Sequence, residues 1–184
     1  MRHNSTVWAV CTLLVVVLCS TIARSQDSSG STPLREHLVG SWSLVSRVTT
    51  STADGKIIPD PGLASTPSGM LIYDRSGHVA AQLSRKGRTV EMIPGDCRDA
   101  AQIKGTSDTA QTVLGYDAYF GTYSIDEKQH VVTHHLESAL FPGDVGKDIK
   151  RSFSLDGDTL TIKFNTTTHE GVAVTRTLVW KRLQ

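Results

Sequence analysis

Short segments that alternate apolar and polar residues, separated by turn sequences, restrict the fold of this chain more than any other feature. Residues 53–56 (Ala-Asp-Gly-Lys), 74–77 (Asp-Arg-Ser-Gly) and 156–158 (Asp-Gly-Asp) are such turns, and the flanking segments are rich in β-branched and aromatic residues. Because the connections are short, consecutive strands are expected to be antiparallel neighbours. About eight to ten such strands with one apolar face close most easily into an up-and-down β-barrel, with an open β-sandwich as the alternative.

Three other segments do not fit the strand pattern. Residues 34–39 predict a short helix that stops at Gly40. Residues 59–68 contain three prolines and are expected to form an ordered loop. Residues 99–104 and 107–114 carry the remaining helical signals. They interrupt the series of hairpins, so we expect a helical, lid-like excursion across an open end of the barrel.

The N-terminal 25 residues have the layout of a secretory signal peptide. A basic start at Arg2 precedes an apolar run over residues 7–18, and small residues precede an expected cleavage after Ser25. An apolar run of about 12 residues is too short to span a bilayer comfortably. A lipid anchor on Cys19 is the alternative, but Leu18 stands where such sites need a small residue.

We therefore predict a signal peptide over residues 1–25, a flexible leader over 26–33 and one β-barrel domain over 34–184. The protein is expected to be secreted or periplasmic. Of the three cysteines, only Cys97 follows the signal peptide, so no internal disulfide can stabilise the domain.

The charge balance argues against two classes of partner. The whole chain has 19 basic and 18 acidic residues; loss of Arg2 and Arg24 with the signal peptide leaves 17 against 18, a formal charge of −1. No basic surplus remains to attract nucleic acid or an anionic membrane. We expect neither nucleic-acid binding nor stable membrane insertion after cleavage.

Strand alternation assigns side chains to faces. In the long segment 130–144, His134 shares a side with Leu136, whereas His135 and Glu137 are expected to face outward. In the first strand Trp42, Leu44 and Ser46 are expected on one side, and Ser43, Val45 and Arg47 on the other.

The same reasoning places Arg151 beside Phe153, and Arg176 beside Leu178, on apolar faces. Buried charge is costly unless it is paired, so these groups either contact partners in the wall or converge on a ligand with an anionic or carbonyl group. A mostly apolar cavity with a few polar anchors is typical of small-molecule sites. The predicted ligand-binding residues are Tyr73, Tyr119, Tyr123, His134, Leu136, Arg151, Phe153 and Arg176.

The histidines do not predict a metal centre. His130 and His134 lie about 13 Å apart on an extended strand, and His134 and His135 point to opposite faces. We expect no metal and no cofactor. No Gly-x-Ser-x-Gly motif and no glycine-rich phosphate loop is present in the sequence. If the protein is an enzyme, His134 is the candidate general base, with Arg151 beside it.

Residues 38–46 (Leu-Val-Gly-Ser-Trp-Ser-Leu-Val-Ser) resemble the opening motif of the lipocalin-like domain family. The resemblance covers roughly residues 34–182 and continues through residues 67–73, 77–83, 118–123, 134–142, 151–158 and 178–182. It implies a lipocalin-type barrel with Gly40 and Trp42 at the closed end. It also implies that Arg182 packs on Trp42, which gives these residues a structural role and no part in ligand binding.

Three functions are compatible with these features. We expect an exported carrier that holds a small, largely hydrophobic molecule in the barrel interior. A cofactor-free isomerase, cyclase or hydrolase that uses His134 and Arg151 in the same cavity is the alternative. A third possibility is a partner-binding module whose barrel is packed solid, in which the interior holds no more than a few water molecules.

Overall fold

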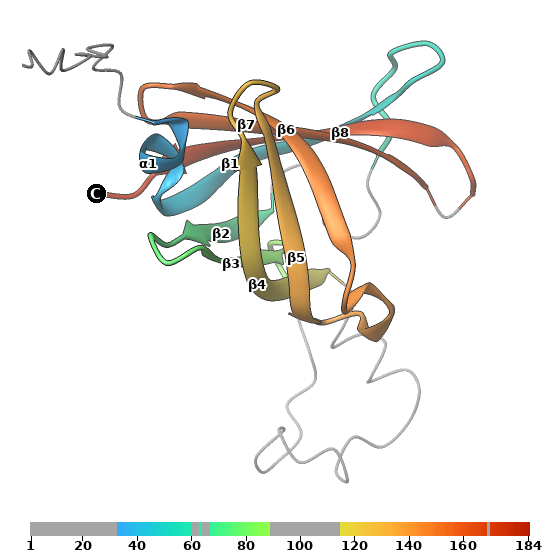
Figure 1. The fold of residues 1–184 in the computed structure, drawn as a ribbon. Coiled ribbons are helices and arrows are strands. Elements are labelled where there is room, and N and C mark those ends of the chain that lie inside the picture. Colours follow the sequence, from blue (N-terminus) through green and yellow to red (C-terminus); the bar gives the residue numbers. More distant parts are fainter. Residues whose placement is uncertain (1–32, 60–62, 64–66, 89–114, 169) are drawn as a thin grey trace, which may run out of the picture. The chain divides into compact units, whose positions relative to one another are not determined.

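The alternating segments form strands of a closed barrel in the computed structural model (Figure 1), which describes residues 33–59, 63, 67–88, 115–168 and 170–184. The elements, in chain order, are α1 (Leu34–Leu38), β1 (Gly40–Ser51), β2 (Ser68–Tyr73), β3 (His78–Ser84), β4 (Tyr116–Asp126), β5 (Val131–Ala139), the short 3-10 helix η2 (Pro142–Asp144), β6 (Asp148–Asp156), β7 (Thr159–Thr167) and β8 (Ala173–Arg182).

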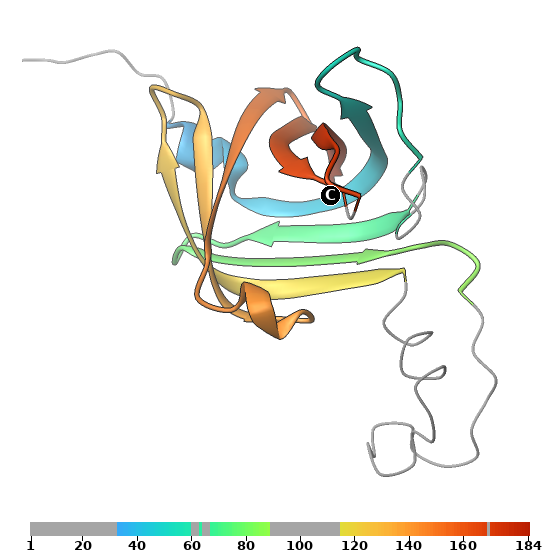
Figure 2. The same cartoon turned by 90° about the vertical axis from the view of Figure 1, so that its right-hand side faces the viewer.

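Each strand pairs antiparallel with the next along the chain, and β1 pairs with β8 to close the barrel. The strands wrap around a common interior, as the turned view shows (Figure 2). The predicted up-and-down β-barrel and the short N-terminal helix are confirmed, and the β-sandwich alternative is wrong. The helical excursion expected over residues 99–104 and 107–114 lies outside the described residues.

Arg182 ties the last strand to the start of the first. Its guanidinium lies 4.1 Å from the centre of the Trp42 ring, and Nη1 donates a hydrogen bond of 2.8 Å to the Val39 carbonyl. Nη2 donates to the carbonyl of His37, at the end of α1. Gly40 has a φ of 143°, and a Cβ atom there would collide with the Arg182 guanidinium. The packing of Arg182 on Trp42 is therefore confirmed.

A β-bulge changes which residues of β1 face the interior. The pairing with β8 shifts register between Leu44 and Ser46, so that Val45 is exposed and Arg47 is buried. Such a bulge adds one residue to one strand and reverses the alternation beyond it. The prediction that Arg47 lies on the opposite face from Trp42 is wrong for this reason.

The wall of the barrel is incomplete between β6 and β7. These strands pair only from Ser152 with Lys163 to Asp156 with Thr159. Beyond that point β6 continues to pair with β5 as far as Asp148, and β7 continues to pair with β8 as far as Thr167. Residues 148–151 and 164–167 consequently diverge, and Figure 1 shows β6 running away from β7.

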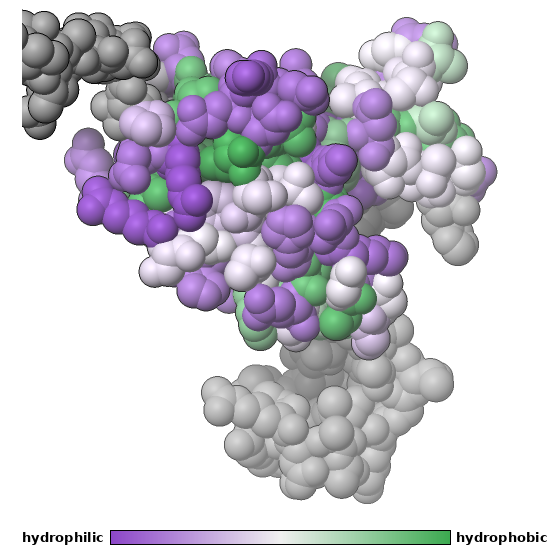
Figure 3. Space-filling view, viewed as in Figure 1, coloured by the Kyte–Doolittle hydropathy of each residue, from purple (hydrophilic) through white to green (hydrophobic). Residues whose placement is uncertain are grey.

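The outer surface visible in Figure 3 is largely hydrophilic, with small hydrophobic areas between the polar side chains. No helix among the described residues is long and apolar enough to cross a membrane.

Candidate functional site

His134 is the centre of a buried polar network inside the barrel. Its side chain, on β5, has no exposed surface. The Tyr73 hydroxyl lies 2.7 Å from Nε2, and the Tyr119 hydroxyl lies 3.0 Å from Nδ1. Arg151 Nη1 lies 3.1 Å from the same Nδ1. Strands β2, β4, β5 and β6 thus bring together four of the residues predicted from the sequence.

These contacts determine the protonation state of the imidazole. Arginine can only donate a hydrogen bond, so Nδ1 must accept one from Arg151 and carries no proton. The proton of the neutral ring is therefore on Nε2, which donates to the Tyr73 hydroxyl. Burial, followed by repulsion from Arg151 and His135, lowers the pKa of His134 well below its usual value of 6.5. His134 is neutral in the folded protein.

Burial keeps the neighbouring phenols neutral as well. It raises the pKa of Tyr73 well above 10, and nearby Tyr119 adds to the effect. It also raises the pKa of Tyr119, which the positive charge of Arg151 partly opposes. The network therefore contains one permanent charge, that of Arg151, among neutral hydrogen-bonding groups.

Arg151 is buried, and no acidic side chain of the described residues forms an ion pair with it. Its side chain is 9% exposed, and the guanidinium lies 5.0 Å from the ring centre of Phe164 and 5.5 Å from that of Tyr119. Among the described residues its one hydrogen bond is to His134, and no carboxylate lies within 4.0 Å. The other N–H donors of the guanidinium have no acceptor among the described residues, and none of them is fully buried, so water or a ligand can reach them.

A small internal cavity of about 60 Å³ borders this network. Its polar lining consists of Arg47, Asp117, Tyr119, Arg151, Arg176 and the indole of Trp180. Trp180 is 2% exposed, and its Nε1 has no hydrogen-bond acceptor within the described residues. Burial, together with repulsion from Arg176, lowers the pKa of Arg47 to about 10. Burial raises the pKa of Asp117, while Arg151 and Arg47 oppose the increase.

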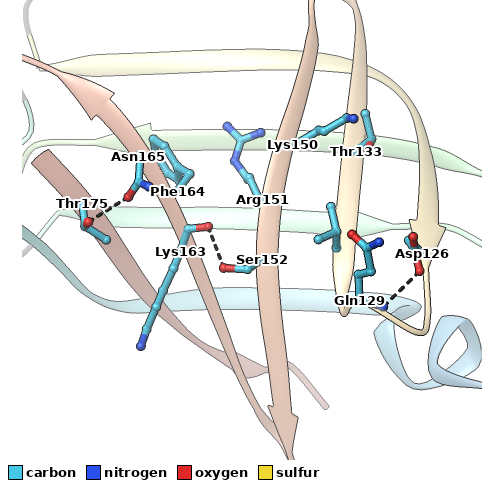
Figure 4. Close-up of a pocket in the computed structure, with 11 residues that line it drawn as sticks. Asp126, Gln129, Thr133, Lys150, Arg151, Ser152, Lys163, Phe164, Asn165 and Thr175 are labelled. Carbon is cyan, nitrogen blue, oxygen red and sulfur yellow. Dashed lines mark hydrogen bonds between the residues drawn. The ribbon is translucent and has the colours of Figure 1, made fainter. Parts of the chain in front are cut away.

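A much larger groove of about 520 Å³ lies outside the barrel wall, where β6 and β7 diverge. It is lined by Asp126, Gln129, Val131, Thr133, Lys150, Arg151, Ser152, Lys163, Phe164, Asn165 and Thr175. Figure 4 shows Arg151 and Phe164 in the space between the two strands. These two side chains also line the internal cavity, so they form the boundary between the cavity and the groove.

The other predicted ligand residues are placed differently. Arg176 lines the internal cavity. Tyr123 packs edge-on against Tyr73, with ring centres 4.9 Å apart, but its hydroxyl donates to the Asp74 carbonyl. Leu136 and Phe153 are buried and line neither the cavity nor the groove, and Phe153 stacks on His130.

Sequence reasoning missed Arg47 and Asp117. Arg47 is inward because of the bulge in β1, and no sequence signal marks that bulge. Asp117 lies on β4 two residues before Tyr119, on the same side of the strand. Since Tyr119 is a predicted ligand-binding residue, the alternation rule applied to this strand could have identified Asp117.

His135 lies on the outer face of β5, as expected, in a chain of three polar side chains. The Ser124 hydroxyl lies 2.9 Å from His135 Nε2, and Asp148 Oδ1 lies 2.6 Å from Nδ1. This order is that of a serine-hydrolase triad. Ser124, His135 and Asp148 are at least partly exposed and line neither the groove nor the internal cavity.

Within the described residues, no three His, Cys, Asp or Glu side chains gather closely enough to hold a metal ion.

The family model of the lipocalin-like domain matches residues 39–183. The chain belongs to the lipocalin-like domain family. A separate comparison with curated proteins finds no match to the chain. Small-molecule binding is the general function of such barrels, and the closed lipocalin-like barrel seen here is consistent with it.

Proposed function

We propose that this lipocalin-like protein is an exported binding protein for a small amphipathic molecule. The groove of about 520 Å³ between β6 and β7, which reaches the buried network through Arg151 and Phe164, carries the proposal. Its volume falls in the range of roughly 300–1,000 Å³ that is typical of small-molecule sites. Export rests on the signal-peptide pattern of residues 1–25.

The volumes of the internal cavity and the groove indicate that the ligand lies mainly in the groove. The internal cavity of about 60 Å³ is far below the roughly 300–1,000 Å³ of typical small-molecule sites, so it has space for a polar group but not for a whole ligand. The expectation that the ligand lies entirely in the interior is therefore replaced by a site that begins in the groove. The small volume of the internal cavity is also compatible with the alternative of a partner-binding module with a solidly packed barrel. The groove favours a small-molecule site instead, because such a module does not require a groove of this volume.

The enzymatic alternative has less support from the geometry. Both ring nitrogens of His134 are engaged by groups of the protein, and the ring has no exposed surface. A general base must be within hydrogen-bond reach of the proton that it removes. A substrate would first have to displace Tyr119 and Arg151 from Nδ1.

Binding of the neutral, environment-sensitive fluorophore 1-N-phenylnaphthylamine tests the proposed function. We expect saturable binding that Ser152→Trp weakens at least about tenfold, because an indole at Ser152 fills part of the groove. Ser154→Trp is the matched control: it is the same exchange two residues along β6, outside the groove. Equal binding by both variants would place the probe elsewhere, and no binding to the folded protein would contradict the proposal.

A further inference from the structure

We propose that the ligand is a small carboxylate with an apolar body, and that its carboxylate passes between β6 and β7 to bind Arg151. The body then remains in the groove. This inference rests on the proposed function and specifies its ligand class and orientation.

Two groups at the internal cavity are donors that lack an acceptor among the described residues. Nδ1 of His134 has one lone pair, but the Tyr119 hydroxyl and Arg151 Nη1 both lie within 3.1 Å of it. One of these donors therefore needs another acceptor. The Trp180 indole N–H borders the same cavity and also lacks an acceptor in the described structure. A ligand that supplies oxygen acceptors satisfies donors whose burial is otherwise unfavourable.

The acceptor that best matches the free N–H donors of Arg151 is a carboxylate. A guanidinium presents its N–H groups as a planar fork that matches the two oxygens of a carboxylate. Asp117 lies in the same lining, yet it does not come within ion-pair distance of Arg151. A ligand carboxylate can take the position next to Arg151 that no acidic side chain of the described residues occupies.

The charges of the described lining residues favour an anion both in the internal cavity and in the groove. The described lining of the internal cavity has three arginines and one carboxylate, Asp117. The described residues that line the groove include Lys150, Arg151 and Lys163 and one carboxylate, Asp126. A lining with one prevailing sign of charge attracts ligands of the opposite sign.

The geometry also specifies the orientation of the ligand. The internal cavity of about 60 Å³ is large enough for a small polar group such as a carboxylate but not for an apolar chain. The groove is almost nine times larger by the volumes of 520 and 60 Å³, and Phe164 and Val131 supply its apolar contacts. The β6–β7 pairing stops at Ser152 and Lys163, so no ladder hydrogen bond blocks the way beside Arg151.

Calorimetric titration with decanoate, decan-1-ol and decyltrimethylammonium at pH 8 tests the inference, since the three share a chain and differ in charge. We expect decanoate to bind about 10- to 100-fold more tightly than decanol, as a charged hydrogen-bonded pair predicts, and the ammonium compound to bind least. Arg151→Met should remove the preference for decanoate over decanol, because a thioether presents no N–H donors to a carboxylate. Lys181→Met, which removes an exposed positive charge outside both spaces, is the control.

Each outcome separates the inference from the proposed function. If 1-N-phenylnaphthylamine binds but decanoate binds no better than decanol, or does not bind, the inference is wrong and the proposed function stands. A preference for decanoate that survives Arg151→Met rejects Arg151 as the carboxylate site. If neither the fluorophore nor any decyl compound binds, the proposed function fails too. Should Arg151→Met not fold, the three decyl compounds decide the ligand class with the wild-type protein.

Discussion

At the scale of single residues, the site depends on groups that are kept neutral by burial around one buried positive charge. His134 accepts from Arg151 through Nδ1 and donates to Tyr73 through Nε2, which is possible only for the neutral ring. The imidazole is contacted by Tyr73 on β2, Tyr119 on β4 and Arg151 on β6. None of these three side chains has a negative charge that could stabilise imidazolium. Protonation of His134 is thus unfavourable in the folded state.

We expect His134 to make the protein less stable at acidic pH. Its folded pKa lies well below the unfolded value of 6.5, so only the unfolded chain binds this proton just below pH 6.5. The free energy of unfolding should decrease by about 1 kcal/mol for each pH unit below 6.5, until the folded pKa is reached. Denaturant titrations between pH 7.5 and 5 measure this slope.

One variant isolates this contribution. His134→Gln should flatten the slope, because it removes the group whose pKa differs between the folded and unfolded states. A His134 imidazole that becomes protonated at pH 6 in the folded protein, observed by nitrogen-15 NMR, would contradict the assignment even if His134→Gln does not fold.

At the scale of elements, the two ends of the strands serve different purposes. At the start of β1, Arg182 from β8 stacks on Trp42 and donates to the carbonyls of Val39 and His37. Between β6 and β7 the ladder ends early, and the groove occupies that place. Contacts of Arg182 therefore connect β8 to α1 and β1 at one end of the barrel. The β6–β7 pairing ends early elsewhere in the wall, and the groove lies there.

Replacement of Arg182 should destabilise the barrel without affecting the groove. Arg182→Ala removes a cation–π contact and hydrogen bonds from a charged donor, and we expect a loss of roughly 2–4 kcal/mol in the free energy of unfolding. Arg182→Lys should recover only part of it, because an ammonium lacks the planar fork. Equilibrium unfolding measures both variants. A loss as small as that of the exposed-site control Lys181→Ala would contradict the structural role of Arg182.

At the scale of the whole molecule, closure of the sheet gives every strand two hydrogen-bonded neighbours. Each of the eight strands pairs with two neighbours, and only Cys97 follows the predicted signal peptide. The core is built around Trp42, Trp180, Tyr73 and Leu71, which come from three different strands. Loss of one strand exposes that core and leaves two unpaired sheet edges.

The mature protein should therefore unfold in one cooperative transition that does not depend on reductant. Far-ultraviolet circular dichroism and tryptophan fluorescence should give coincident curves in guanidinium chloride, since Trp42 and Trp180 lie in the same core as the strands that enclose it. Dithiothreitol should not move the midpoint. Two separate transitions, or a midpoint lowered by reductant, would argue against a single barrel held by its core.

The sequence by itself determined the barrel, because alternation and short turns act locally and leave few ways to bury one apolar face. Alternation also predicted that His134 and Arg151 face inward. Tyr73 and Tyr119 are among the predicted ligand-binding residues, and the four side chains form one network. Only the tertiary structure decided that Arg47 is inward and that β6 parts from β7, since a bulge and an early end of pairing depend on neighbouring strands far away in sequence. The size of the cavity was likewise decided by packing, because the volume that side chains leave empty depends on all eight strands at once.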